Sequence, residues 1–368
     1  MTGCARFTSD NTAVEIPPPG AAEPTLAEMW LKSGYLYPGR DWLTLSWAGR
    51  ALLGDEAWNV AADGSVADSS VFENRDVSTM PAGFFSGDGV FGPAPRGPWR
   101  VVRLKRGGGT PGFVGEDAGG RRWVVKPDAE GFDELGSAAE AIAARVYFGL
   151  GYRVPATHVV TIHGTGDAQW DGRRASASAL LPGEPAGTWR MDRLRMRREV
   201  RALRLAAAWL NDTDRHDRNT LVTIEDGRAR FWLIDFNGAL GCWNGRPKAP
   251  WRGWRYAWDV EWQVLGALTL GLARPGYAAD QPVISTAVGR LDSAFEPMTW
   301  RGQYPVTAFD RMTPADARWM VTRMLRLSEA QLDEVVAAGA YSRAEDSMYI
   351  RRVLGERRAR IAAAVGGG

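Results

Sequence analysis

Short apolar runs separated by glycine-rich turns fill the middle of the chain, and they predict β-strands. Residues 99–104 read Trp-Arg-Val-Val-Arg-Leu, and residues 123–125 read Trp-Val-Val. Phe113-Val114 lies between them, with glycine-rich turns on both sides. Runs of this length, rich in β-branched and aromatic residues, are typical of strands in a meander. Two further strands are expected at 154–162 and 175–181.

One helical segment interrupts these strands. Residues 137–150 begin with Ser137, an N-cap candidate, and Glu140 follows three residues later to give a capping-box pattern. Gly151 marks the expected end of the helix. The segment from 99 to 186 is therefore predicted to have the order β-β-β-α-β-β.

The chain after residue 187 is predicted to be mostly helical. One long helix is expected at 190–210, and a polar loop follows at 211–219. Apolar runs on either side of the turn Glu225-Asp226-Gly227 then predict a β-hairpin. The remaining helices are expected at 258–273, 314–326, 328–338 and 344–364.

These patterns indicate two closely packed lobes, because 368 residues are more than one simple core accommodates. The predicted divisions are a polar tail at 1–25, an irregular extension at 26–98, a β-rich lobe at 99–186 and a helical lobe at 187–368. The expected fold class is therefore α+β and bilobal, with an N-terminal extension packed on the outside.

Composition and charge remove several classes of function. The net charge of +2 gives no indication of nucleic acid or an anionic membrane as a partner. No apolar run approaches the roughly 20 residues that a membrane-spanning helix needs. Only two cysteines, Cys4 and Cys242, and three histidines are present, which argues against a disulfide framework and against structural zinc.

The first residues give an ambiguous signal for localisation. Met1-Thr2-Gly3-Cys4 looks like the end of a bacterial lipoprotein signal, but no basic and apolar region precedes it. As written, the chain favours the cytoplasm. An extracytoplasmic lipoprotein is the alternative if a signal was trimmed before Cys4.

The strongest chemical signal is the hexapeptide Asp214-Arg215-His216-Asp217-Arg218-Asn219, followed across the hairpin by Asp235 at the end of an apolar strand. Phosphoryl transfer uses such a set: a carboxylate for the acceptor hydroxyl, and an amide and a second carboxylate for Mg²⁺. Asp214 is the candidate base, Asn219 and Asp235 are the candidate metal ligands, and His216 could assist proton transfer or bind a phosphate.

Two other interpretations compete for this loop. A polar turn after a helix would also use Asn and Asp, but it does not explain a second carboxylate at a strand end, where burial is costly without a cation. A calcium loop fails, because Asp217 stands where glycine is required and Thr223 where glutamate is required.

Residues earlier in the chain could bind the nucleotide on which this loop would act. Lys126 ends an apolar strand and Glu140 lies in the next helix, which is the order of the phosphate-binding lysine and its glutamate partner in kinase-type sites. Gly108 and Gly109 belong to a glycine-rich turn whose backbone amides could approach phosphates, although plain turns explain the glycines equally well.

Two groups of residues are interpreted as structural. Arginines at 190, 193, 195, 197, 198, 201 and 204 are expected to form a solvated helix face, with recruitment of a phosphate by one or two of them as the alternative. Tryptophans at 232, 243, 251, 254, 258 and 262 are expected to pack in the core, with an aromatic wall for the acceptor as the alternative.

The loop residues carry a family resemblance. Asp214-Arg215-His216-x-x-Asn219 with Ile234-Asp235-Phe236 resembles the catalytic and metal loops of the phosphatidylinositol 3-/4-kinase group. It is also similar to HipA-type bacterial kinases, whose loop reads Asp-x-His-x-x-Asn. The segments 138–140 and 151–155 are similar to the glutamate helix and the following turn of that second group. Other segments, at 66–75, 109–113, 180–183 and 308–313, resemble uncharacterised bacterial proteins that often look exported.

The resemblance implies a kinase-like fold and assigns roles within it. It implies Lys126 as the phosphate lysine, Glu140 as its partner, Asp214 as the catalytic aspartate, Asn219 and Asp235 as metal ligands, and Leu181 beside adenine. Asn237 departs from the pattern, because many kinases have glycine after Asp-Phe, and the glycine loop is irregular.

The expected function is transfer of the ATP γ-phosphate, assisted by Mg²⁺ or Mn²⁺, to a hydroxyl on an unidentified protein or small molecule. Two alternatives stay open at this point: an inactive kinase-like nucleotide-binding module, and AMP transfer on the same fold.

Overall fold

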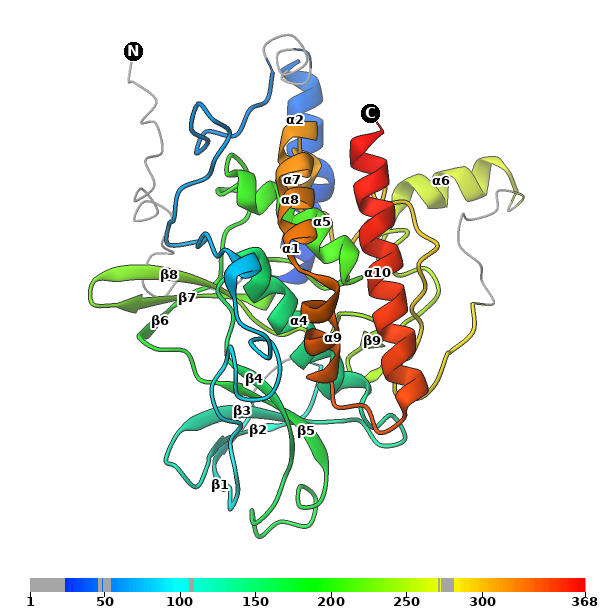
Figure 1. Ribbon diagram of the computed structural model, residues 1–368. Helices are drawn as coiled ribbons and strands as arrows, with labels where there is room; N and C mark the ends of the chain where they lie inside the picture. Colours follow the sequence, from blue (N-terminus) through cyan, green and yellow to red (C-terminus); the bar gives the residue numbers. More distant parts are fainter. Residues whose placement is uncertain are drawn as a thin grey trace.

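A computed structural model describes residues 24–45, 48, 54–105, 109–270, 272 and 281–367. A β-sheet lobe and a larger helical lobe are stacked along the long axis of the molecule, with helix α4 between them (Figure 1). The expected α+β class with a β-rich N-terminal lobe and a helical C-terminal lobe is therefore confirmed.

The sheet lobe is antiparallel throughout and has the strand order β1-β2-β3-β5-β4. Its strands are β1 Arg100–Leu104, β2 Phe113–Glu116, β3 Arg122–Pro127, β4 Thr157–Thr161 and β5 Arg174–Ala179. In β3, Lys126 pairs with Ser176 of β5 and follows the buried Val125. The alternation of buried and more exposed side chains along β3 is thus broken at its end, where Lys126 is also buried.

Helix α4, Leu135–Leu150, packs on this sheet and is buried along nearly its whole length. Its first turn is capped by Asp128: Oδ2 accepts the backbone N–H of Glu134 at 2.8 Å, and Oδ1 accepts that of Ser137 at 2.7 Å. The expected capping box of Ser137 and Glu140 is therefore wrong. Both residues lie inside the helix, and Asp128 at the end of β3 takes over the cap.

The helical lobe contains a second, three-stranded sheet with the order β6-β7-β8. Its elements are β6 Glu184–Gly187, α5 Arg198–Trp209, η4 Asp217–Asn219, β7 Thr220–Glu225, β8 Arg228–Leu233, β9 Cys242–Trp243, β10 Arg246–Pro247, α6 Val260–Leu268, α7 Thr307–Asp310, α8 Pro314–Arg326, α9 Glu329–Ala337 and α10 Ala344–Gly366. The hairpin β7–β8 turns at Asp226-Gly227, both with positive φ.

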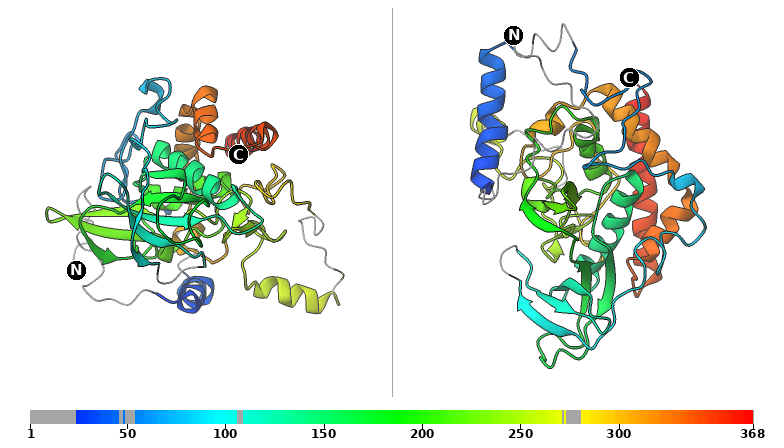
Figure 2. Two further views of the ribbon diagram at one scale, coloured as in Figure 1. Left: turned by 90° about the horizontal axis from the view of Figure 1, so that it is seen from below. Right: turned by 90° about the vertical axis from the view of Figure 1, so that its left-hand side faces the viewer.

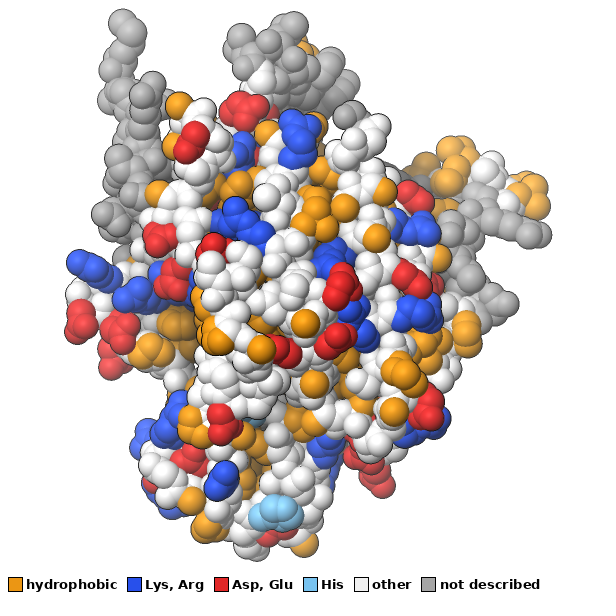
Figure 3. Space-filling view, viewed as in Figure 1, with side chains coloured by type: hydrophobic (Ala, Val, Ile, Leu, Met, Phe, Trp, Pro, Cys, Tyr) orange, Lys and Arg blue, Asp and Glu red, His pale blue; other side chains and the backbone are white. Residues whose placement is uncertain are grey.

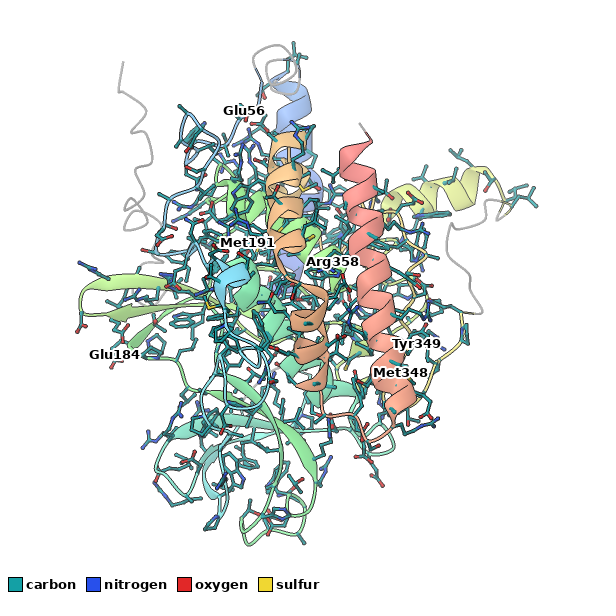
Figure 4. The ribbon with its side chains drawn as sticks, in the orientation of Figure 1. Glu56, Glu184, Met191, Met348, Tyr349 and Arg358 are labelled. Atoms are coloured by element: carbon teal, nitrogen blue, oxygen red, sulfur yellow. The ribbon has the colours of Figure 1, made fainter. Side chains whose placement is uncertain are left out.

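The helix expected at 190–210 begins only at Arg198. Residues before it contact the polar loop at 211–219 and the start of β7 instead. The Met191 N–H donates to Asp217 Oδ1 at 3.2 Å, and the Trp189 N–H donates to Thr220 Oγ1 at 2.8 Å. Met191 lies inside the helical lobe and is 1% exposed (Figure 4). These tertiary bonds replace the helical ones that the sequence pattern favours.

The arginines of this region do not form a solvated face. Arg198 and Arg201 are 5% and 0% exposed, and both bind Asp316 at the start of α8, at 3.0 Å and 3.6 Å. Arg197 is also buried and binds Glu199 at 2.6 Å. Burial of a charge requires such partners, so Arg198 and Arg201 join α5 to α8 instead of facing solvent.

The N-terminal extension is more regular at its start than expected. Helical segments α1 Leu26–Leu31, η2 Lys32–Leu36 and α2 Tyr37–Leu43 form one rod along a side of the helical lobe (Figure 2, right). Residues 54–98 then cross the molecule without regular elements apart from η3 Val77–Thr79. Buried Phe72 and Phe85 attach this part to the main core.

The described surface carries no large field of one charge sign on the face shown in Figure 3, where basic and acidic side chains alternate. Helix α6 projects from the body. Its last residue, Leu268, and Leu270 just after it are 78% and 90% exposed. In the part of the chain that is described, no helix combines the length and apolar character needed to cross a membrane. Cys242 is a buried free thiol whose pKa is raised by burial to about 12, and Cys4 lies outside the described residues.

A buried histidine in β4 gives a testable pH dependence. His158 is 4% exposed, and burial together with the nearby Arg145 lowers its pKa from 6.5 to about 4. Between these pH values the unfolded chain binds a proton that the folded chain does not. Stability therefore falls as pH drops from 6.5 to 4, by about 2–3 kcal/mol from this one group.

His158→Phe is expected to remove this part of the acid sensitivity, because phenylalanine keeps the edge contacts with Trp123 and Phe91. Urea unfolding of both proteins at pH 7 and pH 4.5 measures it. An equal loss of stability on acidification in both proteins would contradict the assignment to His158.

Candidate active site

The buried lysine of β3 joins three elements. Lys126 Nζ forms ion pairs with Glu140 of α4 and with Asp235, the latter at 3.1 Å. Burial disfavours the charged form of Lys126, but the two carboxylates outweigh it and raise its pKa. Glu140 also accepts the Phe236 N–H on Oε2 at 3.2 Å. The sheet, α4 and the segment after β8 are therefore held in one arrangement.

Asp235 is held in a conformation that few residues adopt. Its φ is +55°. The residue lies two positions after the end of β8 and directly before the buried Phe236. Burial raises the pKa of this carboxyl, but Lys126 and Lys105 lower it more, so the net shift is downward and the carboxylate is the stable form. A non-glycine residue in the left-handed region next to a charged cluster is typical of functional sites.

The loop before β7 builds a fixed carboxylate at Asp214. Asn219 Nδ2 donates to Asp214 Oδ2 at 2.8 Å, and His216 Nε2 lies 3.0 Å from Oδ1. Nδ1 of His216 accepts the Arg218 N–H at 3.2 Å, so the ring proton belongs on Nε2 and points to Asp214. Both oxygens of Asp214 are thus oriented, and its side chain keeps 17% exposure.

Arg215 connects this loop to the segment after β8 that carries Asp235. Its NH1 donates to the backbone oxygens of Asn219 and Ile234, at 2.6 and 3.0 Å, and its NH2 donates to that of Asp235 at 2.9 Å. Its Nε pairs with Asp212 at 2.9 Å, and both side chains are fully buried. One arginine therefore fixes the spacing between the two halves of the site.

Helix α4 supports the same pair from the other side. The Tyr147 hydroxyl donates to Asp212 Oδ2 at 2.8 Å, and the Tyr147 ring lies 5.4 Å from the ring of Phe236. Glu140 and Tyr147 are two turns apart on α4, so one face of this helix contacts both loops.

A cavity of about 260 Å³ opens between the lobes beside Lys126 and Asp235. Leu180 and Leu181, which follow β5, form part of its wall together with Val114 and Val124. Its size is close to the lower end of the range for small-molecule sites. The structure thus places Leu181 on the cavity, where the sequence analysis expects the adenine.

Gly109 and Thr110 of the glycine-rich turn lie against residues that follow Asp235 in the chain. A Cβ on Gly109 would lie 2.7 Å from the side chain of Asn244, so a larger residue there would require the Asn244 side chain to move. Asn237, the residue that departs from the common kinase pattern, donates from Nδ2 to Thr110 Oγ1 at 2.7 Å. It therefore ties the segment after Asp235 to the glycine-rich turn. Gly108 lies outside the described residues.

The donor set fits a divalent cation that is shared with phosphates. Asp235 keeps a quarter of its side chain exposed on the cavity, and Asn219 has its Oδ1 left for a cation because Nδ2 binds Asp214. Within the described ranges, no three His, Cys, Asp or Glu side chains form a metal centre by themselves. Phosphate and water oxygens would complete the shell, as is usual for Mg²⁺. The metal role of both residues stays a prediction.

Sequence reasoning missed several residues of the site. Lys105 and Arg103 of the β1 end line the cavity, and Lys105 Nζ donates to Thr110 O at 3.0 Å. Burial and the neighbouring Lys126 lower the pKa of Lys105. The position of Lys105, two residues before the glycine run, was the available signal. The tryptophans expected in the core are also misplaced: all six are half-buried or exposed.

The lysine strand, its glutamate helix, and the two loops with Asp214 and Asp235 occur in the order and contacts of a protein kinase. The chain has a protein-kinase-like fold. The expected likeness to atypical kinases is confirmed at the level of fold, and the likeness to the phosphatidylinositol kinases stays a prediction.

No family model and no curated protein matches the chain. Among solved structures, it is similar to the Helicobacter pylori proinflammatory kinase CtkA, with 10% identity, a TM-score of 0.45, and coverage of 73% of this chain and 94% of that one. It is also similar to HipA in the toxin–antitoxin system of Shewanella oneidensis, with 13% identity, a TM-score of 0.33, and 72% and 66% coverage.

A third similar structure is the Golgi casein kinase with Mn and ADP bound, with 11% identity, a TM-score of 0.33, and 72% and 73% coverage. These values are too low to transfer a substrate or a residue role. The site therefore rests on the chain's own geometry.

Proposed function

We propose that this protein is an ATP-dependent phosphotransferase that moves the γ-phosphate to a hydroxyl, with Mg²⁺ or Mn²⁺ as the assisting ion. The observation that carries the proposal is the contact of Lys126 with both Glu140 and Asp235 at the edge of a cavity, while Arg215 links the Asp214 loop to Asp235. Such positioning supplies most of the catalysis in phosphoryl transfer.

Each residue has a role that follows from its contacts. Lys126 would bind the α- and β-phosphates, and Glu140 would keep its ammonium in place. Leu180 and Leu181 would contact the adenine ring of ATP. Asn219 and Asp235 would hold the cation, whose contribution is to neutralise charge on the phosphates.

Asp214 would orient the acceptor hydroxyl and take its proton. The new bond joins the acceptor oxygen to the γ-phosphorus, the bond to the bridging oxygen breaks, and its electron pair leaves with ADP. His216 and Asn219 each donate to one oxygen of Asp214, which keeps the carboxylate turned in one direction. His216 is thus a positioning residue in this proposal.

Intact-mass measurement after incubation with ATP and Mg²⁺ or Mn²⁺ tests the reaction type. Addition of a phosphoryl group to the chain, together with ADP release, is the expected result, and Asp214→Asn should reduce both by about 10²–10⁴-fold. The mass of AMP added instead would establish nucleotidyl transfer.

ADP release with water as the acceptor makes the test independent of an autophosphorylation site. Nucleotide binding without any turnover in the wild type would point to a binding module. Equal ADP release by the Asp214→Asn protein would contradict the role of Asp214.

A further inference from the structure

Arg252, a half-buried arginine beside the site, has no carboxylate partner among the described residues. Arg252 NH1 pairs with the neutral side-chain oxygen of Gln303, and within the described ranges its guanidinium forms no ion pair with a carboxylate. Burial lowers its pKa to about 10, against a smaller opposing effect of Asp214. A cation taken partly out of water without a counter-charge is suited to binding an anion.

Two tryptophans hold this guanidinium in place. Its central carbon lies 3.2 Å from the ring centroid of Trp243 and 4.7 Å from that of Trp251. Aromatic contacts of this kind fix the plane of the group while leaving its edge open to a ligand. Two of the half-buried tryptophans of this segment therefore position an arginine, whereas the sequence predicted that they pack in the core.

Two sets of contacts connect Arg252 to the glycine-rich turn and to the Asp214 loop. On one side, Trp243 is followed by Asn244, whose side chain packs on Gly109 of the glycine-rich turn. On the other side, the Gln303 N–H donates to Thr213 O at 2.6 Å, directly before Asp214.

Tyr304 strengthens the second connection. Its ring lies edge-on to that of His216, with centroids 5.2 Å apart, and its hydroxyl accepts from Gln303 Nε2 at 2.7 Å. The arginine is thus anchored to the same loop that orients Asp214.

We propose that Arg252 binds the γ-phosphoryl group at the point of transfer and stabilises the negative charge on its equatorial oxygens. The proposal rests on the proposed phosphotransferase function. In the step, Arg252 exchanges no proton: the acceptor proton goes to Asp214, the acceptor oxygen bonds to phosphorus, and the bridging oxygen leaves on ADP with its electron pair. An arginine in this position acts as a charge clamp supplied by the chain itself.

The test compares the affinity of MgADP with and without aluminium fluoride, which mimics the transferring phosphoryl group. Isothermal titration of the wild-type chain is expected to show tighter ADP binding when aluminium fluoride is present. Arg252→Gln should lose about 10²–10³-fold of this gain and keep ADP affinity without fluoride. Arg252→Lys should recover little, because an ammonium lacks the planar fork that two tryptophans hold.

Arg255→Gln is the matched control, since Arg255 also lies over the Trp251 ring, at 5.5 Å, but stands three residues further along the chain. It should retain both affinities, and thermal melting checks that all variants fold. The inference is overturned if Arg252→Gln keeps the fluoride-dependent gain, as it would if Arg252 bound only an anionic group of the acceptor. It is also overturned if ADP binding alone weakens to the same extent.

The two proposals fail in different ways. A wild-type chain that binds neither ATP nor ADP removes the phosphotransferase proposal and this inference with it. A wild-type chain that turns over ATP, with an Arg252→Gln variant that turns it over equally fast, removes only the role of Arg252.

Discussion

Replacing Asp235 by asparagine is expected to lower ATP turnover by about 10³-fold or more, because several kcal/mol of charge stabilisation depend on a metal-binding carboxylate. Asparagine keeps the shape of the side chain and tolerates the left-handed backbone at φ +55°. The loss would therefore report the charge rather than backbone strain. ADP release at saturating ATP, over a range of Mg²⁺ and Mn²⁺ concentrations, measures the effect.

Asp226→Asn provides a matched control. Asp226 also has a positive φ, +49°, but lies exposed in the turn between β7 and β8. We expect the Asp226→Asn variant to turn over ATP at the same rate as the wild type. If the Asp235→Asn protein retained wild-type turnover at every metal concentration, Asp235 would not be a metal ligand, and the phosphotransferase proposal would lose its main support.

Replacing Arg215 by methionine is expected to destabilise the protein by about 3–5 kcal/mol. The change leaves Asp212 charged and fully buried, and it removes the donors to Asn219, Ile234 and Asp235. Burial alone would lower the pKa of Arg215, but Asp212 raises it, so the guanidinium is charged in the folded state. Urea unfolding at pH 7 measures the loss.

A double variant separates the buried charge from the lost hydrogen bonds. Asp212→Asn combined with Arg215→Met removes the uncompensated carboxylate, so it should recover part of the stability but not the ATP turnover. Arg218→Met, three residues along and exposed, should unfold like the wild type. A single Arg215→Met variant as stable as the Arg218→Met control would show that the buried pair contributes little.

Local chemistry explains which residues of the site could be predicted. Asp214, Asn219 and Asp235 stand at a spacing that phosphoryl transfer requires, and the short hairpin between them forces the two ends together. Lys126 and Glu140 could be paired by order along the chain, since a strand and the next helix pack on each other. In the structure Lys126 contacts both Glu140 and Asp235, and Lys126 and Asp235 line the cavity. Asp214 contacts Asn219 in a separate loop, which Arg215 joins to Asp235, and the chemical roles of all five residues stay predictions.

Residues whose contacts are distant in sequence could not be predicted. Arg252 appears in the sequence as one more arginine in a tryptophan-rich segment, and only Gln303, 51 positions away, brings it to the Asp214 loop. Arg198 and Arg201 show a helical pattern that suits a solvated face, yet Asp316 lies more than a hundred positions further on and allows them to be buried.

The sequence by itself therefore determined the fold class, the lysine–glutamate pair and the two polar loops, because strand and helix periods and short loops are local properties. The tertiary structure alone decided which charges are buried, where the helix before the loop begins, and that Arg252 has no ion pair with a carboxylate of the described residues. These depend on partners that the chain brings together only on folding, and the free energy of a buried charge is set by those partners rather than by its neighbours in sequence.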